Sequence, residues 1–386
     1  MVRKEGKTSE LGFCTKPAPP APLSFPAPYP ILKNMHSGRA RPGELALLQQ
    51  IRARAVPPLR GPLRLGIGDD CALLRLRADE ELAVTTDLSL AGQHFRLDWH
   101  PPESIGHRTL ARGLSDLAAM GARPVAAFLS LALPGNLVQN AKGRAPFIAR
   151  FLDGFFALAR AYRTPLAGGD LAESPIPVAD IVLAGAVRRG RALLRSGARP
   201  GHLLYVTGTL GGAAAGLARL AHWVETSRPA RAACPDPARP APPRLPARLQ
   251  PFLAPHLYPQ PRIAQGLWLA RRALATACID LSDGLSTDLA HLCAESHVAA
   301  EVDAAALPIH SAASLEQALH GGEDYELLFT APPAARVPHR IAGVPITRIG
   351  RILRPRKGRP PVALVNVPGG PQSTQPLNPQ GWQHFS

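Results

Sequence analysis

Two adjacent carboxylates, Asp69 and Asp70, lie in the stretch from Leu65 to Leu74, which reads LGIGDDCALL. They follow two closely spaced glycines and have apolar residues on both sides. A glycine turn lets backbone approach a ligand without a Cβ in the way, and adjacent carboxylates repel each other unless a cation lies between them. Hard divalent cations bind such oxygen ligands. Because an ordinary Gly-Asp-Asp surface turn explains the same residues, the rest of the chain must decide between the two interpretations.

Acidic side chains recur along the chain at glycine turns or at the expected ends of strands. The set comprises Asp69, Asp70, Asp87, Asp170, Asp280, Asp283, Glu323 and Asp324, and a helix adds Asp116. A basic chain that places its few acids in apolar, glycine-flanked positions is expected to assemble a site for several metal ions. Magnesium ions that bridge nucleotide phosphates are the common use of such a cluster, because they neutralise charge on a transferred phosphoryl group. No Ser-His-Asp or Cys-His arrangement competes with this interpretation.

The run from Leu82 to Thr86 predicts a strand that ends in Thr85, Thr86 and Asp87. In open α/β sheets, ligands gather beyond the carboxyl ends of strands, so two hydroxyls and a carboxylate there are well placed for a metal ion. A helix N-cap or a turn would use the same residue types. Both interpretations stay open for these three residues.

Residues Ile105 to Gly121 predict an amphipathic helix, because Leu110, Leu114 and Leu117 fall on one stripe. Asp116 lies off this stripe in the almost entirely small or apolar sequence LSDLAAMGA. A carboxylate in such a neighbourhood usually has a cationic partner, and Arg112 is the obvious nearby candidate. A functional role for Asp116 is therefore weighed against simple solvent exposure.

Gly168, Gly169 and Asp170 form a further glycine turn with an acid at an expected strand end, before a predicted strand from Ile181 to Val187. Arg195 follows in a glycine-containing segment, where a planar guanidinium suits a phosphate as well as it suits the surface. The sequence LLYVTGTLGGAAAGLARL then predicts a strand, a glycine turn and a helix. Its glycines fit neither the dinucleotide-binding nor the Walker spacing, so close packing at the turn explains them.

The segment ATACIDLSDGLSTDLAHLCAES also places an acidic residue at an expected strand end, next to a glycine-containing turn. Asp280 ends a short apolar strand, Ser282 to Gly284 form a turn, and a helix is predicted from about Leu285 with Asp288 in its first turn. Another carboxylate is thereby placed at a strand end.

The last motif, LHGGEDYELLFTAP, joins a double-glycine turn to Glu323 and Asp324. A strand is expected to follow, with Tyr325 and Phe329 on one face. His94 and His320 are the only histidines inside these motifs.

Composition limits the class of protein. The chain has 386 residues, of which 46% are hydrophobic, and this is enough for two domains of common size. Its five cysteines form no Cys-x-x-Cys pair, which suggests neither a structural zinc site nor a disulfide framework. No segment is long and apolar enough to suggest secretion or a membrane span. A reducing, cytoplasmic setting fits best.

The net charge of +16 raises the possibility of a nucleic-acid-binding protein. Nearly all of the excess lies in three segments, which carry +5 in residues 1–41, +4 in residues 228–250 and +6 in residues 348–359. These segments lack the interleaved aromatic residues that a base-stacking surface needs. Solvated or tail-like segments are the preferred explanation, and a basic nucleic-acid-binding protein remains an alternative.

The chain is expected to contain two α/β domains, because strand-like runs alternate with helical stretches. Residues 1–41 are rich in proline and are predicted to be disordered, and translation beginning at Met35 is a possibility. The N-terminal domain is expected over residues 42–188 and the C-terminal domain over 189–386. An insert at 228–261 contains eleven prolines, which predicts a surface loop without regular structure over most of its length.

The motifs together resemble the thiamine-monophosphate kinase family. GIGDDCALL, TTDLSLAGQHF, LSDLAAMGARP, GGD, RALLRSGARPG, VTGTLGGAAAGL, IDLSDGLSTDL and HGGEDYELLF occur in the order of that family and with nearly its spacing. The resemblance runs from about Gly43 to the C-terminal GWQHF. It implies the two-domain fold of the aminoimidazole ribonucleotide synthetase-like superfamily, a homodimer formed through the N-terminal domains, and an active site between the domains.

The resemblance also implies roles for individual residues. It assigns Mg²⁺ ligation to Asp69, Thr85, Thr86, Asp87, Asp116, Asp170, Asp280 and Asp283. It places ATP at Gly169, Asp170, Arg195 and Ser282. It places thiamine monophosphate at His94, Glu323 and Trp382.

The activity that the resemblance implies is phosphorylation of thiamine monophosphate by ATP, with direct in-line transfer and no covalent enzyme intermediate. A selenophosphate synthetase-like sister enzyme is an alternative. It would need a reactive cysteine near a lysine in its N-terminal loop, whereas Cys14 lies in the proline-rich segment, outside the resemblance.

Overall fold

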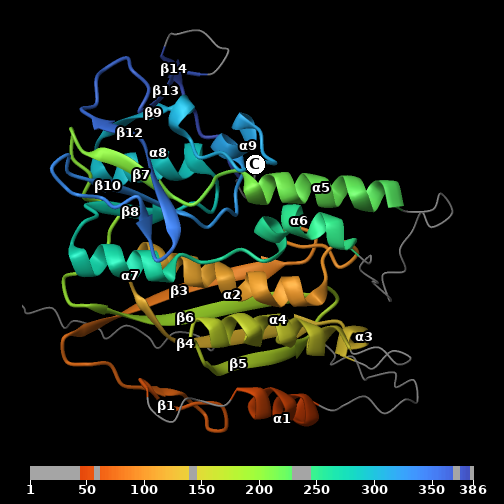
Figure 1. Ribbon diagram of the computed structural model, residues 1–386. Helices are drawn as coiled ribbons and strands as arrows, with labels where there is room; N and C mark the ends of the chain where they lie inside the picture. The colour runs from red at the N-terminus through yellow and green to blue at the C-terminus, as the bar shows by residue number, and fades with distance from the viewer. Residues whose placement is uncertain (1–43, 56–60, 139–145, 228–244, 368–373, 383–386) are drawn as a thin grey trace, which may run out of the picture. The chain divides into compact units, whose positions relative to one another are not determined.

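The computed structural model describes residues 44–55, 61–138, 146–227, 245–367 and 374–382. The chain divides into two compact units, Met1–Arg41 and Pro42–Ser386, and the described residues belong to the second. Within the described part of this unit, two large β-sheets are packed with helices, and a third sheet has only two strands (Figure 1). The predicted disorder of residues 1–41 and the larger part of the predicted insert lie outside the described residues.

The first sheet has four strands in the order β3-β6-β4-β5. The strands β3 and β6 are antiparallel, as are β4 and β6, whereas β4 and β5 are parallel. Helices α2 and α4 cover one face of this sheet, and a short helix, α3, precedes α4. The bounds are β3 Glu80–Leu90, α2 Pro102–Ala119, β4 Arg123–Leu133, α3 Gly135–Val138, α4 Phe147–Ala161, β5 Leu166–Glu173 and β6 Val178–Arg188.

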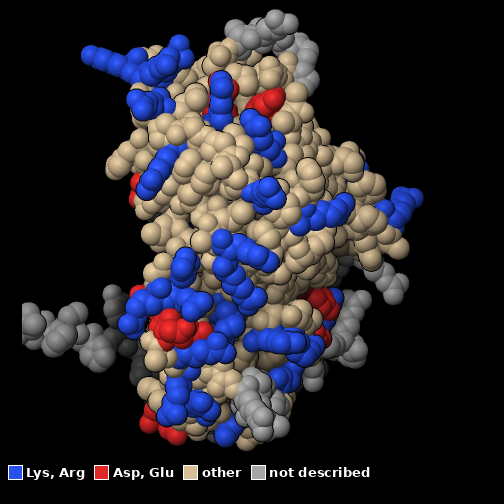
Figure 2. Space-filling view, turned by 60° about the vertical axis from the view of Figure 1, so that its left-hand side comes forward, with Lys and Arg blue, Asp and Glu red and all other residues tan. Residues whose placement is uncertain are grey.

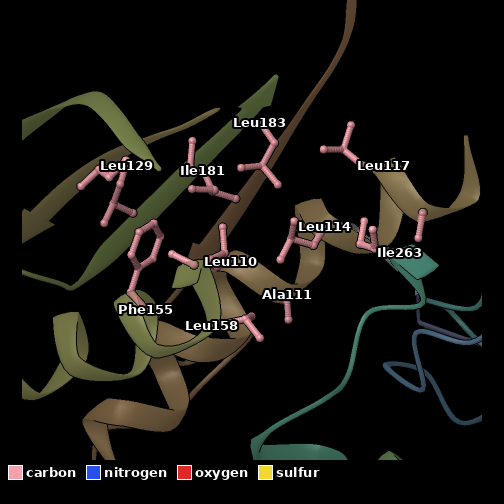
Figure 3. Packing of buried hydrophobic residues seen from close by; sticks show 14 of the residues in the cluster. Leu110, Ala111, Leu114, Leu117, Leu129, Phe155, Leu158, Ile181, Leu183 and Ile263 are labelled. Carbon is pink, nitrogen blue, oxygen red and sulfur yellow. The ribbon is translucent and has the colours of Figure 1, made fainter. Parts of the chain in front are cut away.

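Large apolar side chains from the helices and the strands fill the space between them (Figure 3). Leu110 and Leu114 of α2 and Phe155 of α4 are completely buried against Ile181 and Leu183 of β6. This is the stripe that the leucine spacing predicted, so the expected helix is confirmed as α2. Burial of several such side chains, each contributing about 1.5–3 kcal/mol, holds the helix layer on the sheet.

The opposite face of the first sheet is only partly covered. A two-stranded sheet, β1 (Leu63–Leu65) with β2 (Leu73–Leu74), contributes Leu63 to a small cluster with the alanines of β4 and β6. Helix α1 (Glu44–Arg54) is joined to α4 by an ion pair of 2.7 Å between Arg54 and Asp153. The outward side chains of β3 remain exposed.

The second sheet follows the order β14-β13-β9-β12-β7-β10-β8, with β11 paired to β12. All of its pairings are antiparallel except that of β9 with β13. Its strands are β7 Leu203–Thr207, β8 Ala277–Asp280, β9 Ala299–Asp303, β10 Leu327–Ala331, β11 Arg340–Ile341, β12 Val344–Leu353, β13 Val362–Val365 and β14 Gln375–Pro376. The helical segments around it are α5 Gly212–Ser227, η1 Ala247–Leu249, α6 Gln250–Leu257, α7 Ile263–Arg272, α8 Leu285–Ser296, η2 Ala304–Ala306 and α9 Leu315–His320.

Helix α2 also packs against the second half of the chain. Ile263 of α7 belongs to the same buried cluster as Leu114 and Leu117 (Figure 3). At the start of α7, Arg262 forms two hydrogen bonds of 2.6 and 2.5 Å with the buried carboxylate of Glu326. The apolar contacts of α7 join the two domains along α2, whereas the pair of Arg262 with Glu326 lies within the second domain.

The α/β class, the strands within residues 82–86 and 181–187, and the helix beginning at Leu285 are confirmed. Two positional predictions are wrong: Asp87 lies inside β3 and Gly168–Asp170 lie inside β5, not at strand ends or in a turn. In addition, β10 begins at Leu327, two residues later than expected. Backbone hydrogen bonds to neighbouring strands extend β3 and β5 beyond the strand ends that the local sequence predicts.

The proline-rich insert is also not a surface loop throughout. Its described part, from residue 245, contains η1 and α6, and Leu253, His256 and Leu257 of α6 are buried. Tertiary packing supports a short helix there even though Pro255 lies inside it. No helix in the described ranges is long and apolar enough to cross a membrane.

Basic side chains are spread over the face shown in Figure 2, with acidic side chains among them. In the basic segment 348–359, Arg354, Arg356 and Arg359 are exposed, and Arg351 pairs with Glu301 at 2.9 Å. This distribution agrees with a solvated role for the excess charge of that segment.

The close crossing of α2 and α4 gives a first prediction. A Cβ added at Gly154 would lie 1.8 Å from the carbonyl oxygen of Glu103, so the two backbones meet where only glycine fits. Gly154→Ala should therefore destabilise the protein by about 1–3 kcal/mol in urea unfolding. Helix propensity alone predicts the opposite sign, a gain of about 1 kcal/mol.

The exposed Ala157 of the same helix provides the matched control. Ala157→Gly should cost about 1 kcal/mol by propensity alone. Stabilisation by Gly154→Ala would contradict the proposed close crossing.

Candidate active site

A cavity of about 370 Å³ lies between the two domains and brings together most of the predicted residues. This volume is typical of a small-molecule site. From the first domain it is lined by Asp87, Gly92, Gln93, His94, Phe95, Arg96, Trp99, His100, Arg112 and Asp116, and from the second by Ala213, Ala214, Leu217, His256, Asp280, Ser282, Asp283, Gly322, Glu323, Tyr325 and Trp382.

Two carboxylates from different domains, Asp116 of α2 and Asp280 at the end of β8, lie at the cavity wall. The hydroxyl of Thr85 donates a hydrogen bond to Asp116, and Ser115 donates one of 2.6 Å to Asp280. Burial, followed by the charges of Asp280 and Asp87, raises the pKa of Asp116 to about 7. Burial also raises the pKa of Asp280. The fold therefore holds these carboxylates where their ionised forms are unfavourable without a cation.

The Ser282–Gly284 turn places Asp283 at the cavity and is organised by Asp288. One carboxylate oxygen of Asp288 accepts hydrogen bonds of 3.0–3.1 Å from the backbone N–H groups of Ser282, Asp283 and Gly284. Burial, followed by the charges of Asp280 and Asp283, raises the pKa of Asp288 to about 8. Asp288 thus shapes the turn, and Asp283 is the carboxylate that faces the cavity.

Arg112 pairs with Asp87, and not with Asp116 as the local sequence suggested. Its guanidinium makes two contacts with the Asp87 carboxylate, of 2.8 Å from Nε and 2.6 Å from Nη2. Such a bidentate pair gives both side chains a defined orientation. Asp87 could therefore bind a metal ion only if its carboxylate oxygens contacted both the metal and Arg112, or if the ion pair with Arg112 broke.

Among the described residues, no three Asp, Glu, His or Cys side chains are grouped closely enough to hold a metal ion by themselves. The donor chemistry nevertheless fits Mg²⁺, because the cavity wall offers carboxylate oxygens with raised pKa values beside hydroxyl groups. Mg²⁺ in nucleotide enzymes is usually held by one or two carboxylates, with phosphates and water as its other ligands. The residues therefore suit a metal ion that arrives with a nucleotide.

The remaining predicted acids are not in this cavity. Asp170 of β5 lies in register with Ser130 of β4, and Ser130 lies in register with Asp180 of β6. Asp180 pairs with Leu88, the neighbour of Asp87 on β3. Because side chains alternate along a strand, Asp170 and Asp87 point to opposite faces of the sheet. Asp87 faces α2 and Asp170 faces away from it.

A second cavity of about 360 Å³ is lined by Asp69, Gly169 and Asp170, together with apolar side chains that include Ile51 and Phe128. At Gly169 a Cβ would lie 1.9 Å from the carbonyl oxygen of Leu129, so only glycine fits this approach of β5 to β4. The expected single cluster is thus divided between two cavities. Of the two threonines, Thr85 contacts Asp116, whereas Thr86 shares the outward face of β3 with Leu88.

Arg195 is exposed, and its positive charge lowers the pKa values of Asp116 and Asp280 against the larger effect of burial. This is a suitable position for a group that contacts phosphate. The glycine turn before α5 has a different role, because Asp324 accepts hydrogen bonds from Gly211 (2.6 Å) and Ala213 (3.0 Å). The protein's own carboxylate caps this helix start, which leaves no dinucleotide loop there.

Glu323, His94 and Trp382 line the other side of the first cavity. Nδ1 of His94 accepts a hydrogen bond of 3.0 Å from the Leu90 N–H. Burial alone would raise the pKa of Glu323, but Arg108, His256 and Arg112 lower it well below the usual value, so this residue is a carboxylate. Trp382 is half-exposed at 51%, which leaves its ring accessible to a ligand.

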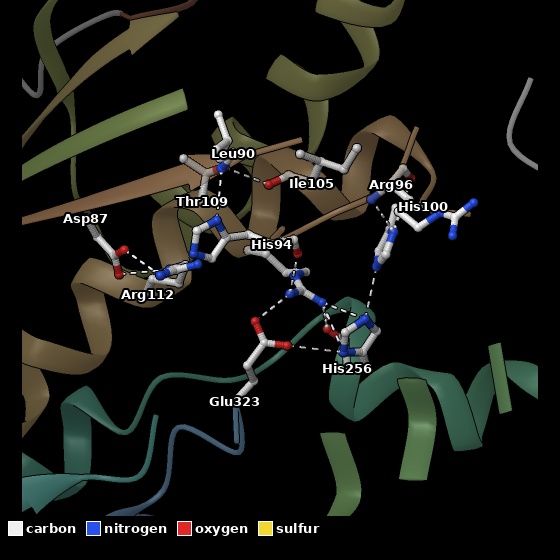
Figure 4. A network of polar contacts seen from close by, with 11 residues as sticks. Asp87, Leu90, His94, Arg96, His100, Ile105, Thr109, Arg112, His256 and Glu323 are labelled. Carbon is white, nitrogen blue, oxygen red and sulfur yellow. Dashed lines mark hydrogen bonds and ion pairs between the residues drawn. The ribbon is translucent and has the colours of Figure 1, made fainter. Parts of the chain in front are cut away.

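The sequence prediction missed Arg108, His100 and His256, which contact Glu323 or each other (Figure 4). Arg108 carried no distinguishing signal beyond its spacing of four residues from Arg112. His256 lies in the proline-rich segment, where local pattern predicted a loop. Only the fold brings these residues to the cavity.

Comparison with known proteins agrees with this geometry. Residues 68–187 match the N-terminal domain of AIR synthase related proteins, and residues 199–361 match their C-terminal domain. The thiamine-monophosphate kinase of Escherichia coli (strain K12) is 39% identical over 356 residues, which cover 89% of this chain and 98% of that protein.

Solved structures give the same result. The crystal structure of thiamine-monophosphate kinase from Stenotrophomonas maltophilia K279a is 40% identical with a TM-score of 0.66, and the match covers 83% of this chain and 96% of that one. The structure of AaThiL complexed with AMPPCP and TMP is 28% identical with a TM-score of 0.65, and the match covers 89% of this chain and 97% of that one.

The two domains are those of the AIR synthase related class. Within that class, the chain belongs to the thiamine-monophosphate kinase family.

The raised pKa of Asp116 gives a second prediction, for protein freed of divalent cations. A carboxyl whose pKa rises from 3.8 to about 7 on folding costs stability once the unfolded carboxyl is ionised, and this cost grows as the pH rises from about 4 to about 7 and is complete above that. Asp116→Asn should therefore raise the free energy of unfolding at pH 8 more than at pH 5, and the difference between the two pH values should be at least about 1.4 kcal/mol, the equivalent of one pKa unit.

Urea unfolding in EDTA at the two pH values measures this difference. Asp153→Asn, at an exposed position of α4, is the control. It should change the free energy of unfolding by the same amount at both pH values. An equal effect of Asp116→Asn at pH 5 and pH 8 would show that charge repulsion is not the cause.

Proposed function

We propose that this protein transfers the γ-phosphoryl group of ATP to the phosphate of thiamine monophosphate and so forms thiamine diphosphate. The observation that carries the proposal is the cavity between the domains, where acidic groups suited to metal-bound phosphates face a wall suited to a cationic heterocycle. Family membership and the relative complexed with AMPPCP and TMP support it. The cytoplasm, which supplies ATP, is the expected location.

Transfer is proposed to be direct and in line. The acceptor phosphate is already an anionic nucleophile at neutral pH, so no covalent enzyme intermediate is needed. The work of the protein is to position the two phosphates and to stabilise the charge that develops between them. Arg195, an exposed cation close enough to affect Asp116 and Asp280, would contact the ATP phosphates together with the Ser282 turn.

Mg²⁺ is the proposed metal. In the first cavity, Asp87, Asp116, Asp280 and Asp283, with the Thr85 hydroxyl, would hold it, and Asp69 and Asp170 form a second set of oxygen ligands at the second cavity beside Gly169. Thr86 lies on the same sheet face as Asp170. When bound, the metal would neutralise charge on the transferred phosphoryl group.

Thiamine monophosphate is proposed to bind between Glu323, His94 and Trp382. Its thiazolium ring is a cation, which favours the face of an aromatic ring such as Trp382. The Glu323 carboxylate adds a fixed negative charge on the same wall. These groups orient the acceptor, while the acids of the opposite wall receive the donor.

The active protein is proposed to be a homodimer that forms through the first sheet. The outward row of β3 exposes Leu82, Val84 and Leu88 by 53, 58 and 51%. A row of exposed apolar side chains on an edge strand, interrupted here by Thr86, is a typical association surface, because association removes it from water and pairs the strand edge. Two copies facing each other here would bury both rows.

The catalytic prediction is that purified protein with ATP and Mg²⁺ converts thiamine monophosphate to thiamine diphosphate, and that Asp116→Asn lowers kcat by about 100-fold or more. The loss follows from removing a negative oxygen ligand beside the phosphates. Product formation is followed by chromatography, with folding checked by circular dichroism.

Asp153→Asn, far from the cavity lining, should keep turnover within about twofold of wild type. No product from folded wild-type protein would overturn the proposed activity, and full turnover by Asp116→Asn would overturn the role of that carboxylate.

The dimer prediction concerns Val84→Glu. A charge in the middle of the exposed β3 row should convert the dimer to a monomer, because two buried like charges would face each other. Light scattering after size-exclusion chromatography measures the mass. Leu194→Glu, at a similarly exposed leucine outside the sheet, should remain dimeric. A dimeric Val84→Glu protein would place the interface elsewhere.

A further inference from the structure

A buried polar network holds Glu323 at the cavity wall (Figure 4). Oε1 of Glu323 accepts a hydrogen bond of 2.5 Å from Nη2 of Arg108 in α2. Its other oxygen, Oε2, lies 3.4 Å from Nδ1 of His256 in α6. Both carboxylate oxygens are therefore engaged by side chains from two other elements.

His256 contacts a second buried histidine. The Nε2 atoms of His256 and His100 are 3.0 Å apart, and each residue is only 3% exposed. Burial, followed by the charge of Arg108, lowers the pKa of His256 to about 4 and that of His100 well below its usual value. Both rings are therefore neutral at neutral pH, and each has one donor and one acceptor nitrogen.

The Glu323 carboxylate selects between the two possible sets of protons on these neutral rings. With its proton on Nδ1, His256 presents a donor to Glu323, and its Nε2 accepts from Nη1 of Arg108, 2.7 Å away, and from Nε2–H of His100. The opposite tautomer, in which Nδ1 accepts from Nη1 of Arg108 at 3.0 Å, would turn a lone pair of His256 towards the carboxylate. In the selected set, Nδ1 of His100 accepts from the backbone N–H of Arg96 at 3.1 Å. The network thus runs from the backbone of the first domain to Glu323 in the second.

Arg108 is the third side chain of the network around Glu323. Its side chain is 6% exposed, and it also donates to the carbonyl oxygens of His94 and His256, each at 3.1 Å. One guanidinium therefore connects Glu323 with the backbone of His94, the other residue on this wall, and with α6. Its buried positive charge requires the negative charge of Glu323.

We propose that Arg108, His256 and His100 are positioning residues that fix the Glu323 carboxylate for binding of thiamine monophosphate. This inference rests on the proposed function for the identity of the substrate. It gives α6, part of the proline-rich insert, a role in the site: His256 projects from α6 onto the wall that binds the acceptor. Loss of the network should weaken binding of the acceptor and leave ATP binding unchanged.

Two substitutions at His256 separate positioning from structural support. Asn places its amide donor close to the position of Nδ1, whereas Gln reaches the position of Nε2 and leaves Oε2 of Glu323 without its donor. His256→Gln should raise the KM for thiamine monophosphate by about tenfold or more, with kcat and the KM for ATP changed less than about twofold. His256→Asn keeps a donor near the position of Nδ1, so its KM for thiamine monophosphate should lie within about threefold of the wild-type value.

His222→Gln, at an exposed histidine of α5, is the matched control and should leave all three constants unchanged. Equal effects of Asn and Gln at His256, or a parallel rise in the KM for ATP, would overturn the positioning role.

Nuclear magnetic resonance of wild-type protein labelled with ¹⁵N-histidine tests the network without any substitution at the site. The expected result at pH 7 is the Nδ1–H tautomer for His256 and the Nε2–H tautomer for His100. A charged His256, or its Nε2–H tautomer, would overturn the proposed arrangement. Absence of kinase activity in wild-type protein would overturn the proposed function, and the tautomers would still decide the network by themselves.

Discussion

The burial of α2 between the two domains is the constraint on which the rest of the site depends. One side of the helix, with Leu110 and Leu114, packs on the first sheet, and Leu117 reaches the cluster that includes α7. Arg108, Arg112 and Asp116 recur at intervals of four residues, so they form a polar stripe on a helix that is otherwise almost fully buried. Because the apolar stripe fixes the rotation of the helix, it also fixes where each of these charges points.

The charges on that stripe each have a specific partner from another element. Arg108 holds Glu323, Arg112 holds Asp87, and Asp116 lies near Asp280 with a hydrogen bond from Thr85. The first two are compensated pairs, whereas the third is a repulsive combination that a cation would relieve. At one end of the cavity, arginine side chains neutralise the carboxylates that they contact. At the other end, Asp116 and Asp280 repel each other, and a bound cation would relieve this repulsion. In the proposed reaction, this asymmetry would give the donor and acceptor phosphates distinct ends of one cavity.

Several site residues could be predicted because their chemistry is local. Asp280 and the Ser282–Gly284 turn lie where the strand and helix signals placed them, and the apolar stripe of α2 places Asp116 correctly off its core face. Predictions failed where long-range pairing decides the outcome. Asp87 and Asp170 looked like strand-end residues, but cross-strand hydrogen bonds continue β3 and β5 past them and alternate their faces. Asp324 looked like part of the acid cluster, yet it caps α5.

The sequence by itself determined the family, the α/β class and most of the chemical groups at the cavity, because motif order, hydrophobic periodicity and turn chemistry are properties of short segments. Only the tertiary structure decided which groups meet. It separated Asp69 and Asp170 from Asp116 and Asp280, since the two faces of one sheet cannot share a cavity. It also joined Arg108, His256 and Glu323, which are far apart in the chain and come together only because α2, α6 and the segment before β10 pack against one another.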